Sequence, residues 1–221
     1  AFTGEILAGA IQDYQRGLIV GDASTHGKGT VQSLLDLGQQ VFHVPQAPSL
    51  GALKITIQQF YRPNGDSTQN RGVLADVPLP SISSNLDVGE SSLDYAVAFD
   101  NVQPVNYRRV GLVGTGLIER INLHSKTRRA ESEDFAKLEK KISHYLEQKE
   151  RKRQSLNETK FLADRADLNT EKEEANELEE LQDQHRPVVK LDFYFKEVLN
   201  IAVDYAQQLA QQSSPVAVGQ R

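Results

Sequence analysis

The chain contains no cysteine and no methionine among its 221 residues. Without cysteine it has no disulfide framework, no thiolate nucleophile and no cysteine zinc site, which is compatible with both cytoplasm and periplasm. No apolar run approaches the roughly 20 residues that cross a bilayer as a helix, so no membrane span is predicted. Because the first residue is Ala1 and methionine is absent throughout, we expect a truncated polypeptide whose signal sequence lies outside this chain.

The charge balance is mildly acidic, with a formal net charge of -5 and 25% charged residues. This composition is typical of a globular chain and gives no sign of a general nucleic-acid or membrane surface. None of the histidines shows HExxH or another ligand spacing, so we expect no metal site and no cofactor. The histidines are His26, His43, His124, His144 and His185.

A lysine flanked by two glycines follows a short apolar segment near the start of the chain. Gly27-Lys28-Gly29 comes soon after the run Leu18-Ile19-Val20-Gly21. An amine held away from water disfavours its charged form and can then accept a proton as a general base. The same pattern also fits an exposed turn. The residues alone therefore leave both a site lysine and a turn lysine open.

A phosphate-binding loop is the first alternative for this segment, because such a loop also ends in Gly-Lys. Gly21 is one residue too far from Gly27, and Gly29 stands where Ser or Thr would hold magnesium. Residues 31–35 indicate a strand, whereas the phosphate-binding loop needs a helix to begin there. The spacing therefore argues against a nucleotide site.

Several motifs follow one another in a fixed order along the first part of the chain. They are EILAGAIQDY (5–14), GKGTVQ (27–32), LKITIQQFYRPNG (53–65), STQ (67–69) and GVLADVPLPS (72–81). Together they resemble the C-terminal processing, or tail-specific, proteases, which are serine/lysine peptidases. The resemblance covers most of the chain, because residues 194–206 also resemble the terminal helix of the long bacterial branch of that family.

The resemblance implies that Lys28 is the general base and that Gln32 orients its amine. In the family a serine attacks the scissile carbonyl and the lysine takes the serine's proton. Positions four apart in an extended segment lie on one face, so Lys28 and Gln32 can converge on one site. Without the resemblance, Gln32 would be interpreted as a polar residue of an edge strand. The implied function is an endopeptidase that cleaves protein or peptide substrates recognised by their C-termini.

The nucleophile is where the sequence departs from the family. The family's serine lies three residues before the glutamate that Glu5 matches, and that position holds Phe2. The nearest hydroxyl belongs to Thr3, which we expect to be an N-cap or turn residue ahead of a helix starting near Gly4 or Glu5. We therefore expect the chain as given to be inactive. Either the serine motif has been lost by truncation, or the chain is a catalytically dead homologue that serves as a substrate-binding or scaffold module.

The hydrophobic periodicity changes along the chain. The β-like runs at 18–20, 31–35, 40–44 and 52–61 indicate an α/β region. The resemblance implies that this region is the C-terminal half of a crotonase-like, ClpP-like spiral peptidase domain, followed by an α-helical domain. The predicted parts are the peptidase part (1–80), a connector (81–116), the helical domain (117–210) and a flexible tail (211–221).

Two amphipathic helices are predicted in the helical domain, one around residues 135–146 and one after Pro187. Between them, a basic cluster at 149–153 and an acidic run at 171–180 are expected to pair within a helical hairpin. Nucleic-acid binding by the basic cluster is the weaker alternative, since no aromatic side chains interleave with it. A helical adaptor, or self-association through this domain, is a third hypothesis. By resemblance, the compartment is the periplasm or cell envelope.

Overall fold

The computed structural model describes residues 2–42, 48–150, 157–159 and 191–213. The chain divides into two compact units. Unit 1 comprises residues 1–78 and 87–115, and unit 2 comprises residues 79–86 and 116–221, so the chain passes between the units three times. The domain limits drawn from the sequence stay a prediction.

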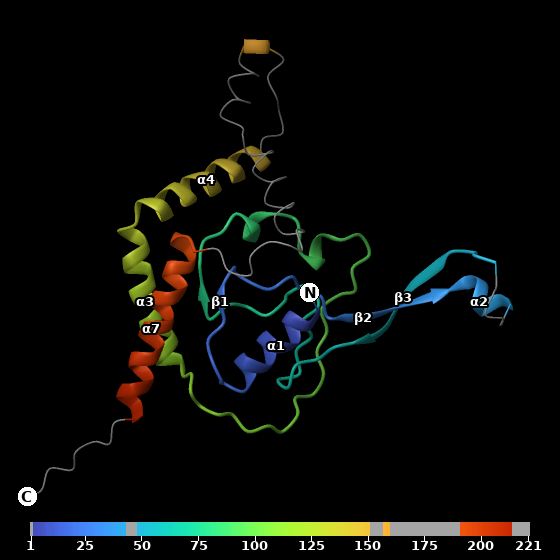
Figure 1. Ribbon diagram of the computed structural model, residues 1–221, viewed down its shortest axis with the longest axis horizontal. Coiled ribbons are helices and arrows are strands. Elements are labelled where there is room, and N and C mark those ends of the chain that lie inside the picture. Colours follow the sequence, from blue (N-terminus) through green and yellow to red (C-terminus); the bar gives the residue numbers. More distant parts are fainter. Residues whose placement is uncertain (1, 43–47, 151–156, 160–190, 214–221) are drawn as a thin grey trace, which may run out of the picture. The chain divides into compact units, whose positions relative to one another are not determined.

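Unit 1 begins with helix α1, Phe2–Asp13 (Figure 1). Glu5, Gly9 and Asp13 are buried at steps of four residues, which places them on one face of the helix. After Asp13 the chain reverses through Gln15, whose φ of 50° is left-handed. The predicted helix is therefore present, with a polar buried face.

The start of α1 differs from the prediction. The helix begins at Phe2, so Thr3 lies inside its first turn and is exposed. An N-cap residue stands outside the first turn, in a non-helical conformation. The N-cap role predicted for Thr3 is therefore wrong.

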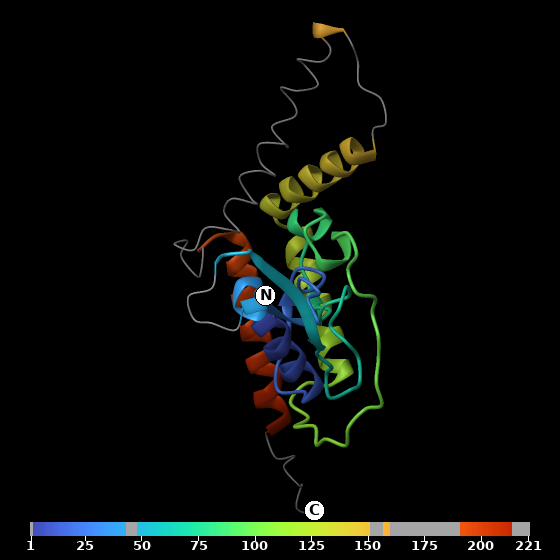
Figure 2. The same cartoon turned by 90° about the vertical axis from the view of Figure 1, so that its right-hand side faces the viewer.

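Two sheets of two strands each form the β-structure of the described residues in unit 1. Strand β1, Val20–Gly21, pairs in parallel with β4, Val77–Pro78. Strand β2, Thr30–Asp36, pairs antiparallel with β3, Ala52–Gln59, and the two form a long hairpin (Figures 1 and 2). The strands predicted at 31–35 and 52–61 are confirmed in their main part, whereas the run 18–20 contributes only Val20.

The prediction of a strand at 40–44 is wrong where the structure describes it. Helix α2, Leu37–Phe42, occupies residues 40–42, and residues 43–44 lie outside the described part. The turn is set by Asp36, whose Oδ1 accepts a hydrogen bond from the Gln39 N–H at 3.1 Å. A Cβ at Gly38 would lie 2.1 Å from the Pro48 carbonyl oxygen, so only glycine fits there. A cap and a close approach thus override the β-like pattern.

Unit 2 contains helices α3, Thr115–Ala130, α4, Glu133–Glu150, and α7, Phe193–Ser213. Phe135 and Tyr145 of α4 are buried, as the predicted stripe requires. In α7, Ile201 is 1% exposed, whereas the next residue, Ala202, is exposed, so the buried stripe of this helix is narrow. The two amphipathic helices are therefore confirmed. α7 continues to Ser213, so residues 211–213 of the predicted tail are helical, and the flexibility of the tail stays a prediction.

Helices α3 and α7 lie side by side in both views and are joined by Arg128 (Figures 1 and 2). The guanidinium donates to Glu197, with Nη2 2.8 Å from Oε1, and to Asp204, with Nη1 2.8 Å from Oδ2. The bond to Glu197 is the main cause that raises the pKa of Arg128 above its ordinary value. Glu197 is 4% exposed, so Arg128 neutralises a buried charge.

Several predicted features lie outside the described residues. They are the acidic run at 171–180, residues 151–153 of the basic cluster, His43, His185 and the tail from residue 214. Among the described helices, none is long and apolar enough to span a membrane.

Candidate active site

Lys28 is presented by a loop whose flanking glycines are required by close backbone contacts. Gly27 has a φ of 89°, and a Cβ there would lie 2.9 Å from the Asn70 carbonyl carbon. A Cβ at Gly29 would lie 2.6 Å from the Gln69 backbone nitrogen. Both distances are shorter than the van der Waals contacts that a Cβ makes, so a side chain at either position would displace the loop.

The amino-terminal side of the loop is held by Glu5 of α1, which is 1% exposed. Its Oε1 accepts a hydrogen bond from the Gly27 N–H at 2.7 Å, and its Oε2 accepts one from the Thr25 hydroxyl. The Gly27 carbonyl in turn accepts the Asn70 N–H at 2.7 Å. A buried carboxylate with two donors is satisfied, and it ties the loop to α1.

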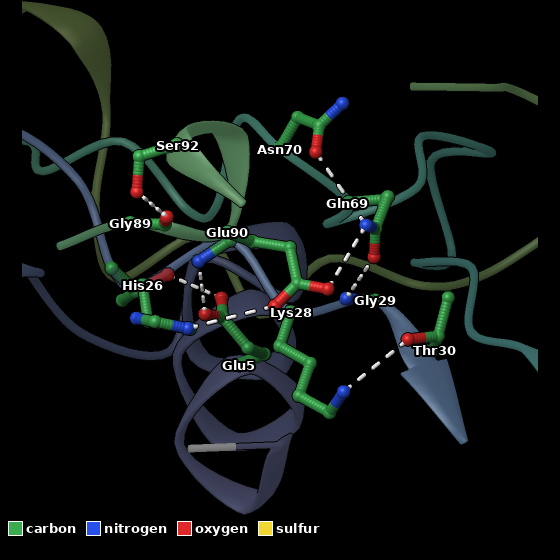
Figure 3. Close-up of polar contacts among 12 residues, drawn as sticks. Glu5, His26, Lys28, Gly29, Thr30, Gln69, Asn70, Gly89, Glu90 and Ser92 are labelled. Carbon is green, nitrogen blue, oxygen red and sulfur yellow. Dashed lines mark hydrogen bonds and ion pairs between the residues drawn. The ribbon is translucent and has the colours of Figure 1, made fainter. Parts of the chain in front are cut away.

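The carboxyl-terminal side is held by Gln69, which is fully buried. Its Oε1 accepts the Gly29 N–H at 2.8 Å, while its Nε2 donates to Glu90 Oε1 at 3.2 Å (Figure 3). The Gly29 carbonyl accepts the Phe60 N–H at 2.7 Å. Lys28 is therefore fixed from both sides by buried hydrogen bonds.

The structure brings Lys28 and Gln32 together. Lys28 Nζ lies 3.0 Å from Gln32 Oε1 and 3.4 Å from Thr30 Oγ1. Thr30 and Gln32 lie two residues apart in β2 and Lys28 lies two residues before the strand, so the three side chains can share one face. Thr30 is buried, Lys28 is half-buried and Gln32 is exposed, so the amine sits at the edge of the interior.

The Lys28 amine has two acceptors within reach. The oxygens of Gln32 and Thr30 each accept from Nζ, and together they fix the direction in which the amine points. The catalytic roles of Lys28 and Gln32 stay predictions.

Three buried residues around the loop were not predicted as functional: Glu5, Gln69 and Glu90. Glu5 and Gln69 belong to the quoted motifs, and their position in those motifs was the available signal. Glu90 lies in the stretch 81–116, where no motif marked it. Polar residues that brace a loop through long-range bonds leave no local pattern in the sequence.

A second buried polar contact joins α1 to Arg62, in the segment that follows β3. Arg62 Nε lies 3.0 Å from Asp13 Oδ2, and Nη2 lies 2.5 Å from Asp13 Oδ1. Nη2 also donates to Gln12 Oε1 at 2.9 Å. The motif residues Arg62 and Asp13 thus form a bidentate pair that anchors the carboxyl end of α1.

Tyr61 reaches the stretch beyond β4. Its hydroxyl donates to Asp100 Oδ2 at 2.9 Å, and this bond is the main cause that raises the pKa of Tyr61. Within the described ranges, no three acidic or histidine side chains gather as metal ligands would.

The peptidase class follows from the sequence match that surrounds this loop. Residues 2–79, which carry Lys28, Gln32 and their supporting contacts, match Peptidase family S41. Residues 83–207, more than half of the chain, match the C-terminal domain of tail specific protease. The chain therefore belongs to the tail-specific protease family.

Two similar proteins are named as proteases. A tail-specific protease of Haemophilus influenzae is 35% identical over 217 residues, which cover 93% of this chain and 31% of that protein. A carboxy-terminal-processing protease of Bartonella bacilliformis is 39% identical over 99 residues, or 42% of this chain and 20% of that protein. The chain thus spans about a third or less of the length of these relatives.

Proposed function

We propose that this chain supplies the general base and its orienting amide to a serine/lysine endopeptidase of the tail-specific kind, working as part of a longer polypeptide. The observation that carries the proposal is the 3.0 Å contact between Lys28 Nζ and Gln32 Oε1. Lys28 takes the proton of a serine hydroxyl as that oxygen attacks the scissile carbonyl, and later returns it to the leaving amine. By family resemblance, the substrates are proteins recognised by their C-termini, the compartment is the cell envelope, and unit 1 is part of a crotonase-like spiral.

The nucleophile is not supplied by the position that matches it. Phe2 stands there, at the first residue of α1, and Thr3 is exposed in the same turn. We therefore expect the 221-residue chain alone to cleave nothing. Lys28-dependent cleavage of an unstructured protein by the purified chain would contradict this expectation.

Phe2 also supports the second candidate, a dead homologue that serves as a substrate-binding or scaffold module. The two candidates differ in the gene upstream of Ala1. A serine within the family's motif in the sequence upstream would favour the peptidase. An open reading frame that continues into Phe2 without such a serine would favour the dead homologue.

Substitution of Lys28 in the complete gene product tests the proposed role. Lys28→Ala and Lys28→Arg should each lower kcat by about 10²- to 10⁴-fold, because neither side chain can accept the proton. Gln32→Ala should lower kcat less, because the amine still reaches a productive geometry at times. Lys54→Ala, at an exposed lysine on β3, is the matched control and should leave kcat unchanged. Full activity of Lys28→Arg would show that the lysine acts only by its charge, and the proposed mechanism would be abandoned.

A further inference from the structure

Glu90 contacts the segment before Lys28 directly and the segment after it through Gln69. It begins the short 3-10 turn Glu90–Ser92 and is 6% exposed. Its Oε1 accepts from Gln69 Nε2 at 3.2 Å, and its Oε2 lies 3.6 Å from His26 Nε2 (Figure 3). Its backbone N–H donates to the His26 carbonyl at 2.9 Å. One buried residue therefore connects the segment before Lys28 with the glutamine that holds the segment after it.

The Glu90 carboxylate decides which way the Gln69 amide points. A side-chain amide has an acceptor oxygen at one end and donor hydrogens at the other, whereas an ionised carboxylate only accepts. Gln69 must therefore turn Nε2 towards Glu90, which leaves Oε1 for the Gly29 N–H at 2.8 Å. The reversed amide would place two donors face to face at Gly29. In a buried site, such unsatisfied groups are costly.

The backbone of Lys28 depends on this orientation because its neighbours are glycines. Gly27 and Gly29 have no side chains that could pack and fix the loop. Glu5 holds the N–H of Gly27, and Gln69 holds the N–H of Gly29. If the bond to the Gly29 N–H is lost, this side of the loop keeps the bond from the Phe60 N–H to the Gly29 carbonyl but loses its buried side-chain contact. The loop is then held less tightly, and the amine can shift with it.

We propose that Glu90 and Gln69 are positioning residues for Lys28, acting through the Gly29 N–H. The inference rests on the proposed role of Lys28 as the base. It extends the site into residues 83–207, the stretch that matches the C-terminal domain of tail specific protease. A catalytic group misplaced by about 1 Å costs on the order of 100-fold in rate, so small movements of this loop are sufficient.

The test exchanges the two side chains in the complete gene product. Gln69→Glu sets two carboxylates against each other, and we expect kcat to fall about 10- to 100-fold while KM stays within about twofold. The double variant Gln69→Glu/Glu90→Gln restores a donor for every acceptor. The carboxylate at position 69 then accepts from Gly29 and from the amide at position 90. We expect its kcat to return to within about threefold of the parent enzyme.

Each outcome decides for or against the proposal. A folded Gln69→Glu enzyme with unchanged kcat overturns it, and so does a folded double variant that stays as slow as the single one. If Gln69→Glu does not fold, Glu90→Ala takes its place, since it removes the acceptor that holds the Gln69 amide. Unchanged kcat in Glu90→Ala then overturns the proposal. Asp94→Asn, an exposed carboxylate in the same stretch, is the matched control.

Amide hydrogen exchange separates this inference from the identity of the base. Exchange in peptides that span residues 25–32 should be faster in Gln69→Glu and return to normal in the double variant. An unchanged exchange rate in Gln69→Glu overturns the positioning role, whatever the base is. Full activity of Lys28→Ala together with the expected exchange pattern would instead refute the proposed function and leave the contact from Glu90 to the loop standing.

Discussion

Replacing Arg62 by methionine tests how strongly a buried ion pair anchors α1. The side chains of Arg62 and Asp13 are 9% and 5% exposed, and the guanidinium meets both carboxylate oxygens, at 3.0 and 2.5 Å. Asp13 is the last residue of α1, where the negative end of the helix dipole disfavours a carboxylate. Arg62→Met leaves this charge buried without a cation. We expect the free energy of unfolding of unit 1 to fall by about 3–5 kcal/mol.

The double variant Arg62→Met/Asp13→Leu separates the pair from the packing around it. With both charges removed, no uncompensated charge remains in the interior. Replacing a buried ion pair by apolar side chains is often neutral, so we expect the double variant to lie within about 2 kcal/mol of the parent protein. The two substitutions should therefore be strongly non-additive, as expected of groups in contact.

Urea unfolding followed by circular dichroism measures these differences, since the chain has no tryptophan to report by fluorescence. Arg71→Met is the matched control. Its side chain is 52% exposed and its guanidinium lies 3.9 Å from Asp66, so its loss should cost less than about 1 kcal/mol. Asp13→Leu completes the set. If the free energy of unfolding of the double variant falls by the sum of the decreases in Arg62→Met and Asp13→Leu, the charges are not coupled and the proposed anchoring is wrong.

Two further substitutions test local features of unit 1. Gly29→Ala places a methyl 2.6 Å from the Gln69 backbone nitrogen, so it should lower the free energy of unfolding by about 1–3 kcal/mol and remove most of the activity. Gly114→Ala is the control, because the space around Gly114 is open, and it should change neither thermal unfolding nor cleavage. The hydrogen bond to Asp100 raises the pKa of Tyr61. The bond therefore stabilises unit 1 fully at pH values below the ordinary tyrosine pKa near 10, and this stabilisation is lost as the pH rises through the raised pKa. In Tyr61→Phe, the free energy of unfolding should therefore fall less steeply as the pH rises above about 10. The absorbance titration of the tyrosines should also lose one group that ionises at high pH, and an unchanged titration would contradict this.

The contact between Lys28 and Gln32 could be predicted because it depends on a local rule. Residues four apart in an extended segment share a face, and the lysine lies just before a strand whose alternation is visible in the sequence. The stripes around Phe135 and Ile201 were predictable for the same reason, with the helical period in place of the strand period.

Features that depend on distant partners could not be predicted. α2 forms because Asp36 caps it and because the Pro48 carbonyl leaves room only for Gly38. Neither contact can be inferred from the hydrophobic pattern, which favoured a strand. Glu90 was missed because its side-chain partners, Gln69 and His26, are distant in the sequence, Gln69 being 21 residues away. Its burial is a tertiary fact with no periodic signal.

The sequence families and the compact units divide the chain at different places. The peptidase match ends at residue 79, yet residues 87–115 belong to unit 1. This later stretch supplies backbone acceptors and donors to the peptidase motifs: the Asp100 carbonyl accepts the Ser67 N–H at 2.9 Å, and the Val102 N–H donates to the Gly65 carbonyl at 2.8 Å. Without the stretch these motif groups lose their partners. The first part of the region that matches the C-terminal domain of tail specific protease therefore completes the unit that carries Lys28. A division of the chain at the boundary between the two sequence matches would separate Glu90 from Gln69 and so cut through the candidate site.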